Sequence, residues 1–276
     1  MPDLTIPAAD GFALAATEFG DATRAERVVL IAPATGVRRR LYRPLAEFLA
    51  AEGFGVVAWD WRGTGDSRPK SLRGFRATMR DWGERDLSGV IDWATRRYPD
   101  ARLTALGHSY GGQAIGLAAN RERVRALVTV AAQSGYWGYW PRPKRYLYAA
   151  LWYVAMPLAA SAVGYFPARF FRLGEDLPRG VAVEWARWCR TPSYLGDWSG
   201  HRAFTAPILS IGFMDDPFAP PLSVEALHAH YGSRTQQRWL IAPEELGAER
   251  IGHFGFFRPG VTPTLWRDVA DWLGRH

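Results

Sequence analysis

Residues 107–111 read Gly-His-Ser-Tyr-Gly, a spacing that can present a serine hydroxyl for nucleophilic attack. Residues 103–106 predict a short buried strand, and residues 112–120, which open on small side chains, predict a helix. A strand, a tight turn and a helix in this order force the central Ser109 into a strained backbone conformation. Gly107 and Gly111 suit such a turn, because a Cβ at either position would collide with the strand or the helix. Ser109 would then stand at a helix N-terminus, where free N–H groups stabilise an oxyanion.

A serine hydroxyl is a weak nucleophile near neutral pH and needs a general base beside it. Of six histidines, His253 alone lies in a loop after a predicted strand, at the sheet edge where Ser109 is expected. We expect His108 to point away from Ser109, and His228 and His230 to lie on an exposed helix. His201 lies in an inserted segment, and His276 ends the chain. The base also needs a carboxylate that orients it and stabilises the imidazolium. Asp215 and Asp216, both at the end of a predicted strand, are the candidates.

The elements that must position these groups alternate between strand and helix, which predicts a parallel sheet covered on both faces. Apolar runs predict strands at 4–6, 12–19, 27–32, 55–59, 103–106, 126–130, 208–211 and 237–241. Helical spacing falls at 41–51, 82–98, 112–120, 222–231 and 264–273. The alternation stops between Gln133 and Ala206. We therefore predict a core of residues 1–132 and 206–276, interrupted by a cap of residues 133–205 above the C-terminal edge of the sheet.

Composition restricts the classes of protein to consider. The net charge is +7, but no basic run resembles a nucleic-acid-binding arm, so no nucleic-acid partner is expected. Cys189 is the only cysteine, and no Cys/His cluster has metal-ligand spacing. Neither a metal nor a cofactor is expected. The first residues lack a basic segment followed by an apolar one, so we expect a cytoplasmic protein without a signal peptide.

Several segments at the predicted strand ends resemble the α/β-hydrolase superfamily. Residues 60–67 read D-W-R-G-T-G-D-S and look like the D-x-R-G-x-G-x-S turn after the fourth strand of that fold. Residues 216–220 read D-P-F-A-P and resemble its D-P-x-x-P acid loop, and Gly252-His253-Phe254 resembles its histidine loop. The chain order Ser, Asp, His is the one that this fold uses. Residues 32–36 and 252–258 are most similar to a bacterial branch near the serine-aminopeptidase-like hydrolases.

The resemblance implies an α/β-hydrolase fold, with a mostly parallel eight-stranded sheet, helices on both faces and an inserted helical cap. It covers the two core segments and not the cap. It also implies a Ser109–His253–Asp216 triad. Asp216 fits the acid-loop motif and is favoured, while the position of Gly212 fits Asp215 better. Some relatives carry the acid after the sixth strand instead, but no Asp or Glu lies between Glu122 and Glu175, which closes that alternative.

The oxyanion hole needs two backbone N–H groups. Tyr110 supplies the first, because it follows the nucleophile. The second is expected from the loop after Ile31, where relatives often have His-Gly and this chain has Ala32-Pro33. Because proline has no N–H, Ala34 is the preferred donor and Thr35 the next. Asp60, Arg62, Asp66 and Ser67 are expected to fix their turn through salt bridges and to do no chemistry.

The predicted cap is rich in aromatic residues, and its first half is basic, with Arg142, Lys144, Arg145, Arg169 and Arg172. No charged residue lies between Tyr146 and Ala168, a length that would span a membrane. A single span there would separate Ser109 from Asp216 and His253, and Pro157, Gly164 and Pro167 are expected to break the helix. We therefore predict one or two cap helices, packed partly on the sheet and partly over the site. A weak docking of this segment on a lipid surface is the other interpretation.

These observations predict a serine hydrolase with an acyl-enzyme mechanism, most simply a carboxylic-ester hydrolase for a small apolar substrate. A peptidase or a thioesterase could use the same groups. A protein that keeps the fold and binds a ligand without catalysis is the hypothesis of another class. Substrate identity and oligomeric state do not follow from the sequence.

Overall fold

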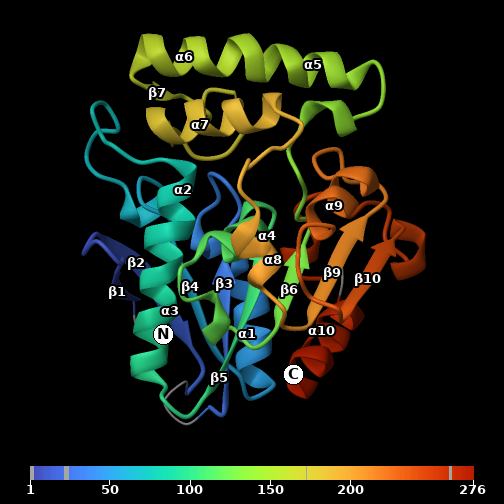
Figure 1. Cartoon of the computed structure of the whole chain (residues 1–276). Helices are drawn as coiled ribbons and strands as arrows, with labels where there is room; N and C mark the ends of the chain where they lie inside the picture. The colour runs from blue at the N-terminus through green and yellow to red at the C-terminus, as the bar shows by residue number, and fades with distance from the viewer. Residues whose placement is uncertain (1–2, 22–24, 172, 261–262) are drawn as a thin grey trace.

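The computed structural model describes residues 3–21, 25–171, 173–260 and 263–276, so Arg172 lies outside it. Its main sheet has the strand order β1-β2-β4-β3-β5-β6-β9-β10 (Figure 1). β2 is antiparallel to both neighbours and the other adjacent pairs are parallel, which confirms the predicted mostly parallel eight-stranded sheet. The strands are β1 (Asp3–Pro7), β2 (Ala13–Phe19), β3 (Arg27–Ala32), β4 (Gly55–Trp59), β5 (Arg102–His108), β6 (Leu127–Val130), β9 (Ile208–Phe213) and β10 (Gln236–Ile241).

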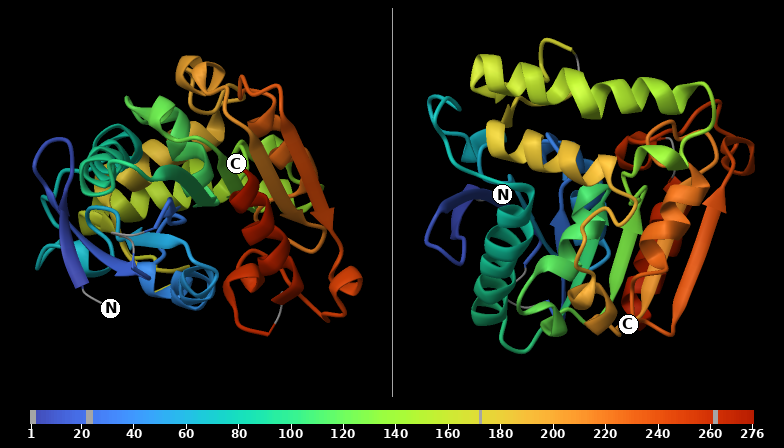
Figure 2. Two further views of the ribbon diagram at one scale, coloured as in Figure 1. Left: turned by 90° about the horizontal axis from the view of Figure 1, so that it is seen from below. Right: turned by 45° about the horizontal axis from the view of Figure 1, so that its top comes forward.

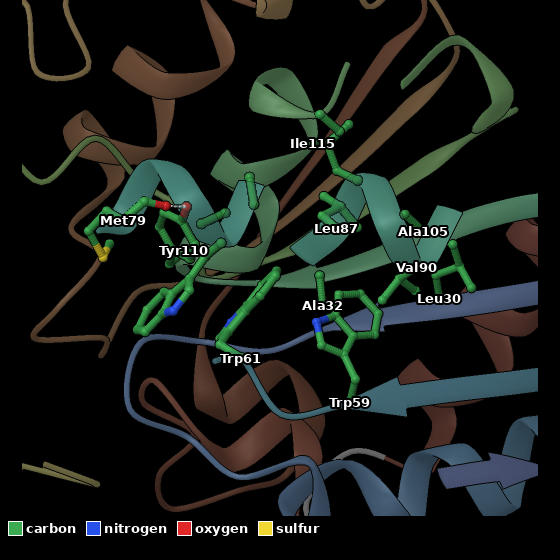
Figure 3. Close-up of a cluster of buried hydrophobic side chains, with 14 of the residues drawn as sticks. Leu30, Ala32, Trp59, Trp61, Met79, Leu87, Val90, Ala105, Tyr110 and Ile115 are labelled. Atoms are coloured by element: carbon green, nitrogen blue, oxygen red, sulfur yellow. Dashed lines mark hydrogen bonds between the residues drawn. The ribbon is translucent and has the colours of Figure 1, made fainter. Parts of the chain in front are cut away.

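Helices cover both faces of this sheet, as Figure 2 shows from below. One face packs against α1 (Arg43–Ala51) and α10 (Pro263–Arg275), which bury Leu45 and Val269 against strand residues such as Ile31. The other face packs against the π-helical η3 (Trp82–Leu87), α3 (Ser88–Arg97) and α4 (Tyr110–Ala114). Figure 3 shows part of this second layer, where Leu87 and Val90 approach Leu30 and Ala105 of the sheet. Central strands that are buried along their whole length, such as β4 and β9, are what a sheet covered twice requires.

Two helical layers lie over the C-terminal edge of the sheet (Figure 1). The outer layer is one continuous helix made of α5 (Lys144–Ala150), the π-helical η7 (Leu151–Ala155) and α6 (Met156–Val163). The inner layer is α7 (Arg179–Arg190), and β7 (Tyr165–Phe166) pairs with β8 (Leu177–Pro178) between the two helices in sequence. Trp152, Met156 and Trp188 of these layers belong to the same apolar cluster as the sheet.

Two predictions about helices are wrong. Pro157 does not break the outer helix: the wider π turn directly before it shifts the hydrogen-bond register, so the missing N–H and the proline ring are tolerated. The helix predicted to reach residue 120 narrows to a 3-10 turn, η4 (Ile115–Leu117), and ends. A Cβ on Gly116 would come within 2.3 Å of the His201 ring, so α8 (Ser199–Ala203) packs directly on this turn. α8 lies within residues 133–205, the predicted cap, but it packs on the core. The boundaries of the cap stay a prediction.

The remaining described elements are short, apart from α9. They are η1 (Arg39–Tyr42), η2 (Gly65–Ser67), α2 (Met79–Asp81), η5 (Arg121–Arg123), η6 (Trp137–Tyr139), α9 (Pro221–His228), η8 (Pro243–Leu246) and η9 (Gly255–Phe257). The turn at 60–67 has the structural role predicted for it. Asp60 accepts hydrogen bonds from the Arg39 side chain and from the N–H of Asp66, and Arg62 pairs with Asp10 and Asp86.

Candidate active site

Ser109 lies in the sharp turn between β5 and α4, with φ 51° and ψ −114°. This is the strained backbone that the sequence predicts. A Cβ on Gly107 would lie 2.4 Å from the N of Gly112, and one on Gly111 would lie 2.0 Å from the carbonyl oxygen of Ala32. Both glycines are therefore required by close backbone contacts. Ser109 N–H donates to the carbonyl of Val130, 2.9 Å away, which fastens the turn to β6.

The structure places Asp216, and not Asp215, on His253. Nδ1 of His253 lies 2.7 Å from Oδ2 of Asp216, and both side chains are buried. The other carboxylate oxygen of Asp216 accepts the N–H groups of Phe218 and Ala219. A carboxylate only accepts, so Nδ1 carries the proton and Nε2 is left free to act as a base. Asp215 instead accepts the N–H groups of Ile251 and Gly252, 2.9 Å away, and so holds the histidine loop.

The ring of His108 holds the backbone of His253 in place. Nε2 of His108 lies 2.9 Å from the carbonyl oxygen of His253, and Nδ1 lies 2.9 Å from the Tyr42 hydroxyl. Because a carbonyl only accepts, Nε2 is protonated and Nδ1 accepts the Tyr42 proton. Burial lowers the pKa of His108 well below 6.5, which keeps this neutral form. His108 points away from Ser109 as expected, and it has the further role of supporting the base.

The same hydrogen-bond chain corrects the prediction for the oxyanion hole. The N–H of Ala34 donates to the Tyr42 hydroxyl, 2.9 Å away and fully buried, so it is not free to meet an oxyanion. Ala34 is therefore the wrong donor, and a sequence contains no signal for a partner eight residues away. Thr35, the next candidate, lines the cavity above Ser109.

Tyr110 is well placed to supply the other N–H. It is the first residue of α4, so its N–H has no acceptor within the helix. Its ring packs edge-on against Trp61 and Trp82, and its hydroxyl donates to the carbonyl of Met79 (Figure 3). The buried side chain thus fixes the backbone that carries this N–H.

The hydroxyl of Ser109 donates to Gln133, whose Oε1 lies 3.4 Å from Oγ. Within the described part of the chain, Oγ makes no hydrogen bond with His253 in this conformation. Ser109 and His253 line the same cavity, and contacts between nucleophile and base are often loose before substrate binds. Gln133, which follows β6, is a site residue that the sequence does not reveal, because a lone glutamine carries no motif.

Ser109, Gln133 and His253 form the floor of a cavity of about 760 Å³. Its roof comes from the two helical layers and the segment between them. The roof is apolar and includes Leu151, Trp152, Met156, Phe166, Leu177 and Trp185. A cavity of this size with few polar groups at one end suits an apolar ligand.

The cavity lining that the structure describes has four charged side chains, those of Arg38, Arg40, Glu175 and Arg258. Glu175 pairs with Arg38 at 3.0 Å and with Arg169, and these two cations lower the pKa of its carboxyl although burial acts in the opposite direction. Arg40 pairs with Asp66. Arg258 also lines the cavity and has no ion pair with any residue that the structure describes. The lining is therefore cationic overall.

One other histidine, His228, does not lie where the sequence predicts it. His228 is fully buried, with Nδ1 on the carbonyl of Val224 and Nε2 on the Thr129 hydroxyl, whereas an exposed helix position was expected. His201 is buried beneath α4, with Nε2 on the carbonyl of Gln113. Among the described residues, no group of three or more His, Cys, Asp or Glu side chains could hold a metal ion.

The model of the serine aminopeptidase S33 family matches residues 21–170, more than half of the chain. This chain belongs to that family. Solved structures share its α/β-hydrolase fold over nearly their whole length. An esterase from Exiguobacterium antarcticum is 17% identical, with 99% of this chain and 98% of the other covered and a TM-score of 0.63. A soluble variant of monoglyceride lipase from Saccharomyces cerevisiae is 14% identical, with 100% and 95% covered and a TM-score of 0.71.

A third solved structure, Est1E from Butyrivibrio proteoclasticus with bound ferulic acid, is 17% identical, with 99% and 98% covered and a TM-score of 0.64. At these identities the likeness is one of fold. The active-site assignment therefore depends on the geometry of this chain.

Proposed function

We propose that this chain is a serine hydrolase that cleaves carboxylic esters of apolar acyl groups through an acyl-enzyme. The observation that carries the proposal is the Asp216–His253 pair, 2.7 Å apart, in the same apolar cavity as the strained Ser109. The family supports the reaction type. The esterases and the monoglyceride lipase that share the fold support an ester as the bond that is cleaved.

Each group in the site has one task in this reaction. Oγ of Ser109 attacks the ester carbonyl while its proton passes to Nε2 of His253, and Asp216 stabilises the imidazolium. The N–H of Tyr110, with that of Thr35, stabilises the oxyanion. The alcohol oxygen leaves with the proton from His253, and the acyl group stays on Ser109. Water then gives a proton to His253 as its oxygen attacks, and the Ser109 oxygen leaves with that proton.

The charges around the cavity favour an ester over the N-terminus of a peptide. An aminopeptidase needs a free carboxylate for the substrate ammonium. Glu175 is the one carboxylate that lines the described cavity, and two arginines already pair with it. Arg38, Arg40 and Arg258 would also repel a cationic substrate. A peptidase that acts on free N-termini is therefore the weaker alternative within this family, and a thioesterase would use the same machinery.

Labelling with a fluorophosphonate tests the proposal. We expect wild type to be labelled, Ser109→Ala and His253→Ala to be unlabelled, and Ser199→Ala, a control outside the cavity lining, to be labelled like wild type. p-Nitrophenyl esters of increasing acyl length should then show kcat/KM rising with length until the cavity is filled. A folded wild type that is neither labelled nor active would refute the proposal and favour ligand binding without catalysis.

The outer helix supports a second proposal, that this face docks on an anionic lipid surface. Residues 144–163 are long and apolar enough to span a membrane, yet the helix lies on α7, and only 17% of its apolar window is buried. Its exposed residues include Tyr146, Leu147, Tyr153, Val154 and Leu158. Arg142 precedes the helix, Lys144 and Arg145 begin it, and no acidic residue lies between Glu122 and Glu175. An apolar face with only basic flanks matches the interface of an anionic bilayer.

Co-sedimentation with vesicles tests this docking. We expect binding to vesicles of phosphatidylcholine with phosphatidylglycerol and less binding to phosphatidylcholine alone. The double variant L147D/L158D should lose binding and keep activity on soluble esters, because both side chains are exposed. Leu222→Asp is the matched control, since Leu222 is a similarly exposed leucine on α9. Absence of wild-type binding to anionic vesicles would refute the proposal.

A further inference from the structure

Gln133 links the nucleophile to the acid loop, a role that the catalytic scheme above does not use. It lies just beyond β6, and its side chain is buried at the cavity floor. Oε1 accepts the Ser109 hydroxyl at 3.4 Å, and Nε2 donates to the carbonyl oxygen of Phe218 at 3.3 Å. The amide therefore spans from Ser109 to the segment directly after Asp216.

The direction of this amide is fixed by its partners. The oxygen of Phe218 is a backbone carbonyl and can only accept, so the NH₂ end of Gln133 faces the acid loop. Its oxygen consequently faces Ser109. The backbone is held as well, because Nε2 of Gln113 donates to the carbonyl of Gln133 at 2.7 Å, and Oε1 of Gln113 accepts the Tyr194 hydroxyl. Gln133 thus presents a pre-oriented acceptor beside the reacting atom.

This acceptor loses its donor during the proposed reaction. Once Ser109 gives its proton to His253 and is acylated, Oγ has no hydrogen to donate. His253 donates from Nδ1 to Asp216, and its Nε2 exchanges protons with the reacting groups. It therefore cannot replace Ser109 as the donor to Oε1 of Gln133. A buried acceptor without a partner is costly, by about 1–3 kcal/mol. The site is therefore most stable with a substrate that supplies a donor at this point.

We infer that Gln133 is a specificity-determining residue whose Oε1 accepts a hydrogen bond from a hydroxyl group close to the scissile ester. The inference rests on the proposed ester hydrolysis. The corresponding substrates are apolar esters with a free hydroxyl within two carbons of the ester group. That hydroxyl can belong to the alcohol part, as in a monoester of a diol, or to the acyl part, as in a 2-hydroxy acid ester. Its chemistry at Gln133 is the same in both cases.

Two matched pairs of substrates separate these sources. Ethyl octanoate is compared with 2-hydroxyethyl octanoate for the alcohol part, and with ethyl 2-hydroxyoctanoate for the acyl part. The measured quantity is the ratio of kcat/KM with and without the hydroxyl, in wild type and in Gln133→Met. Methionine has a similar shape and lacks the amide acceptor. Gln236→Met, a glutamine on β10 outside the cavity lining, is the matched control.

We expect the ratio for one pair to fall about tenfold in Gln133→Met, the effect of one hydrogen bond, and to stay unchanged in Gln236→Met. Fluorophosphonate labelling of Gln133→Met should persist, which shows that the variant is folded and its serine active. If the ratio of kcat/KM with and without the hydroxyl is equal in wild type and Gln133→Met for both pairs, the inference is overturned. Water would then be the donor to Oε1 of Gln133. Wild type without labelling or activity would instead refute the proposed function.

Discussion

The floor and the roof of the cavity are held in place by different kinds of interaction. On the floor, buried hydrogen bonds fix the N–H of Ser109, the ring and carbonyl of His253, and the loop after β3. On the roof, contacts between aromatic rings such as Trp152 and Trp185 hold the two helical layers together. Ion pairs of Glu175 with two half-exposed arginines add to these contacts.

The difference matches what each side must do. Proton transfer and attack depend on the position of atoms to within a fraction of an ångström, and directional bonds on a rigid sheet provide that precision. An apolar acyl chain needs only a surface of suitable size, and ring contacts can adjust to it. Changes to the floor should therefore cost far more than changes to the roof, and the following predictions test that order.

The largest expected effect is on the acid. Asp216→Asn should lower kcat by about 10⁴-fold, because asparagine can hold His253 in the tautomer that has no free base at Nε2. Asp215→Asn should lower kcat far less, since Asp215 meets backbone N–H groups and not the imidazole. Steady-state kinetics on one p-nitrophenyl ester measures both. An equal loss in the two variants would contradict the assignment of the acid, provided that circular dichroism shows both to be folded.

A second prediction uses two buried histidines outside the cavity lining, His228 and His201. Burial lowers the pKa of His228 to about 4 and that of His201 to about 3. Between pH 6.5 and about 4 the unfolded chain therefore binds protons that the folded chain does not. The contribution of each histidine to the free energy of unfolding should fall by about 1.4 kcal/mol per pH unit as the pH decreases through this window, whereas Asp86, whose pKa burial raises to about 7, contributes in the opposite direction. Urea unfolding at several pH values measures the slope.

His228→Gln isolates one part of this slope. Glutamine can keep a hydrogen bond to Thr129 but cannot be protonated, so the decrease with falling pH should be shallower by that one contribution. His230→Gln is the comparison: His230 is only partly buried and stacks on Trp198, so burial lowers its pKa too, but its contribution to the slope should be smaller. A His228→Gln slope identical to wild type would show that this histidine is not kept neutral by the fold.

The sequence predicted most of the core because its signals are local. A strained turn needs glycines at fixed positions, and a strand covered on both faces needs an unbroken apolar run, as at Val28 and Val56. Each feature can be recognised within a few residues, and the order of the catalytic residues follows the order of the strands.

The features that the sequence missed depend on partners outside their own segment. The Ala34 N–H is taken by Tyr42, and the role of Gln133 comes from loops after three different strands. His228 was expected on an exposed helix because its buried partner, Thr129, lies 99 residues away in sequence. The orientation of the predicted cap helices could not be predicted for another reason. Aromatic residues without helical spacing do not show which side of a helix faces the cavity.

The smallest expected effect is on the roof, at Glu175. Glu175→Gln removes the negative charge between Arg38 and Arg169 and keeps the backbone bond from residue 175 to the carbonyl of Gly36. Because half-exposed ion pairs contribute little, the free energy of unfolding should change by about 1 kcal/mol or less.

Substrate preference should nevertheless shift in Glu175→Gln, since the freed Arg38 adds to the positive charge of the cavity lining. The ratio of kcat/KM for an anionic ester, such as a p-nitrophenyl hemisuccinate, to that for a neutral ester of equal length should rise about threefold at low salt. Glu225→Gln makes the same charge change on α9, outside the cavity lining, and should leave the ratio unchanged. If both variants raise the ratio equally, net charge and not Arg38 decides the preference. If only Glu175→Gln does so and the rise disappears at high salt, the roof selects substrates by charge while the floor alone carries the chemistry.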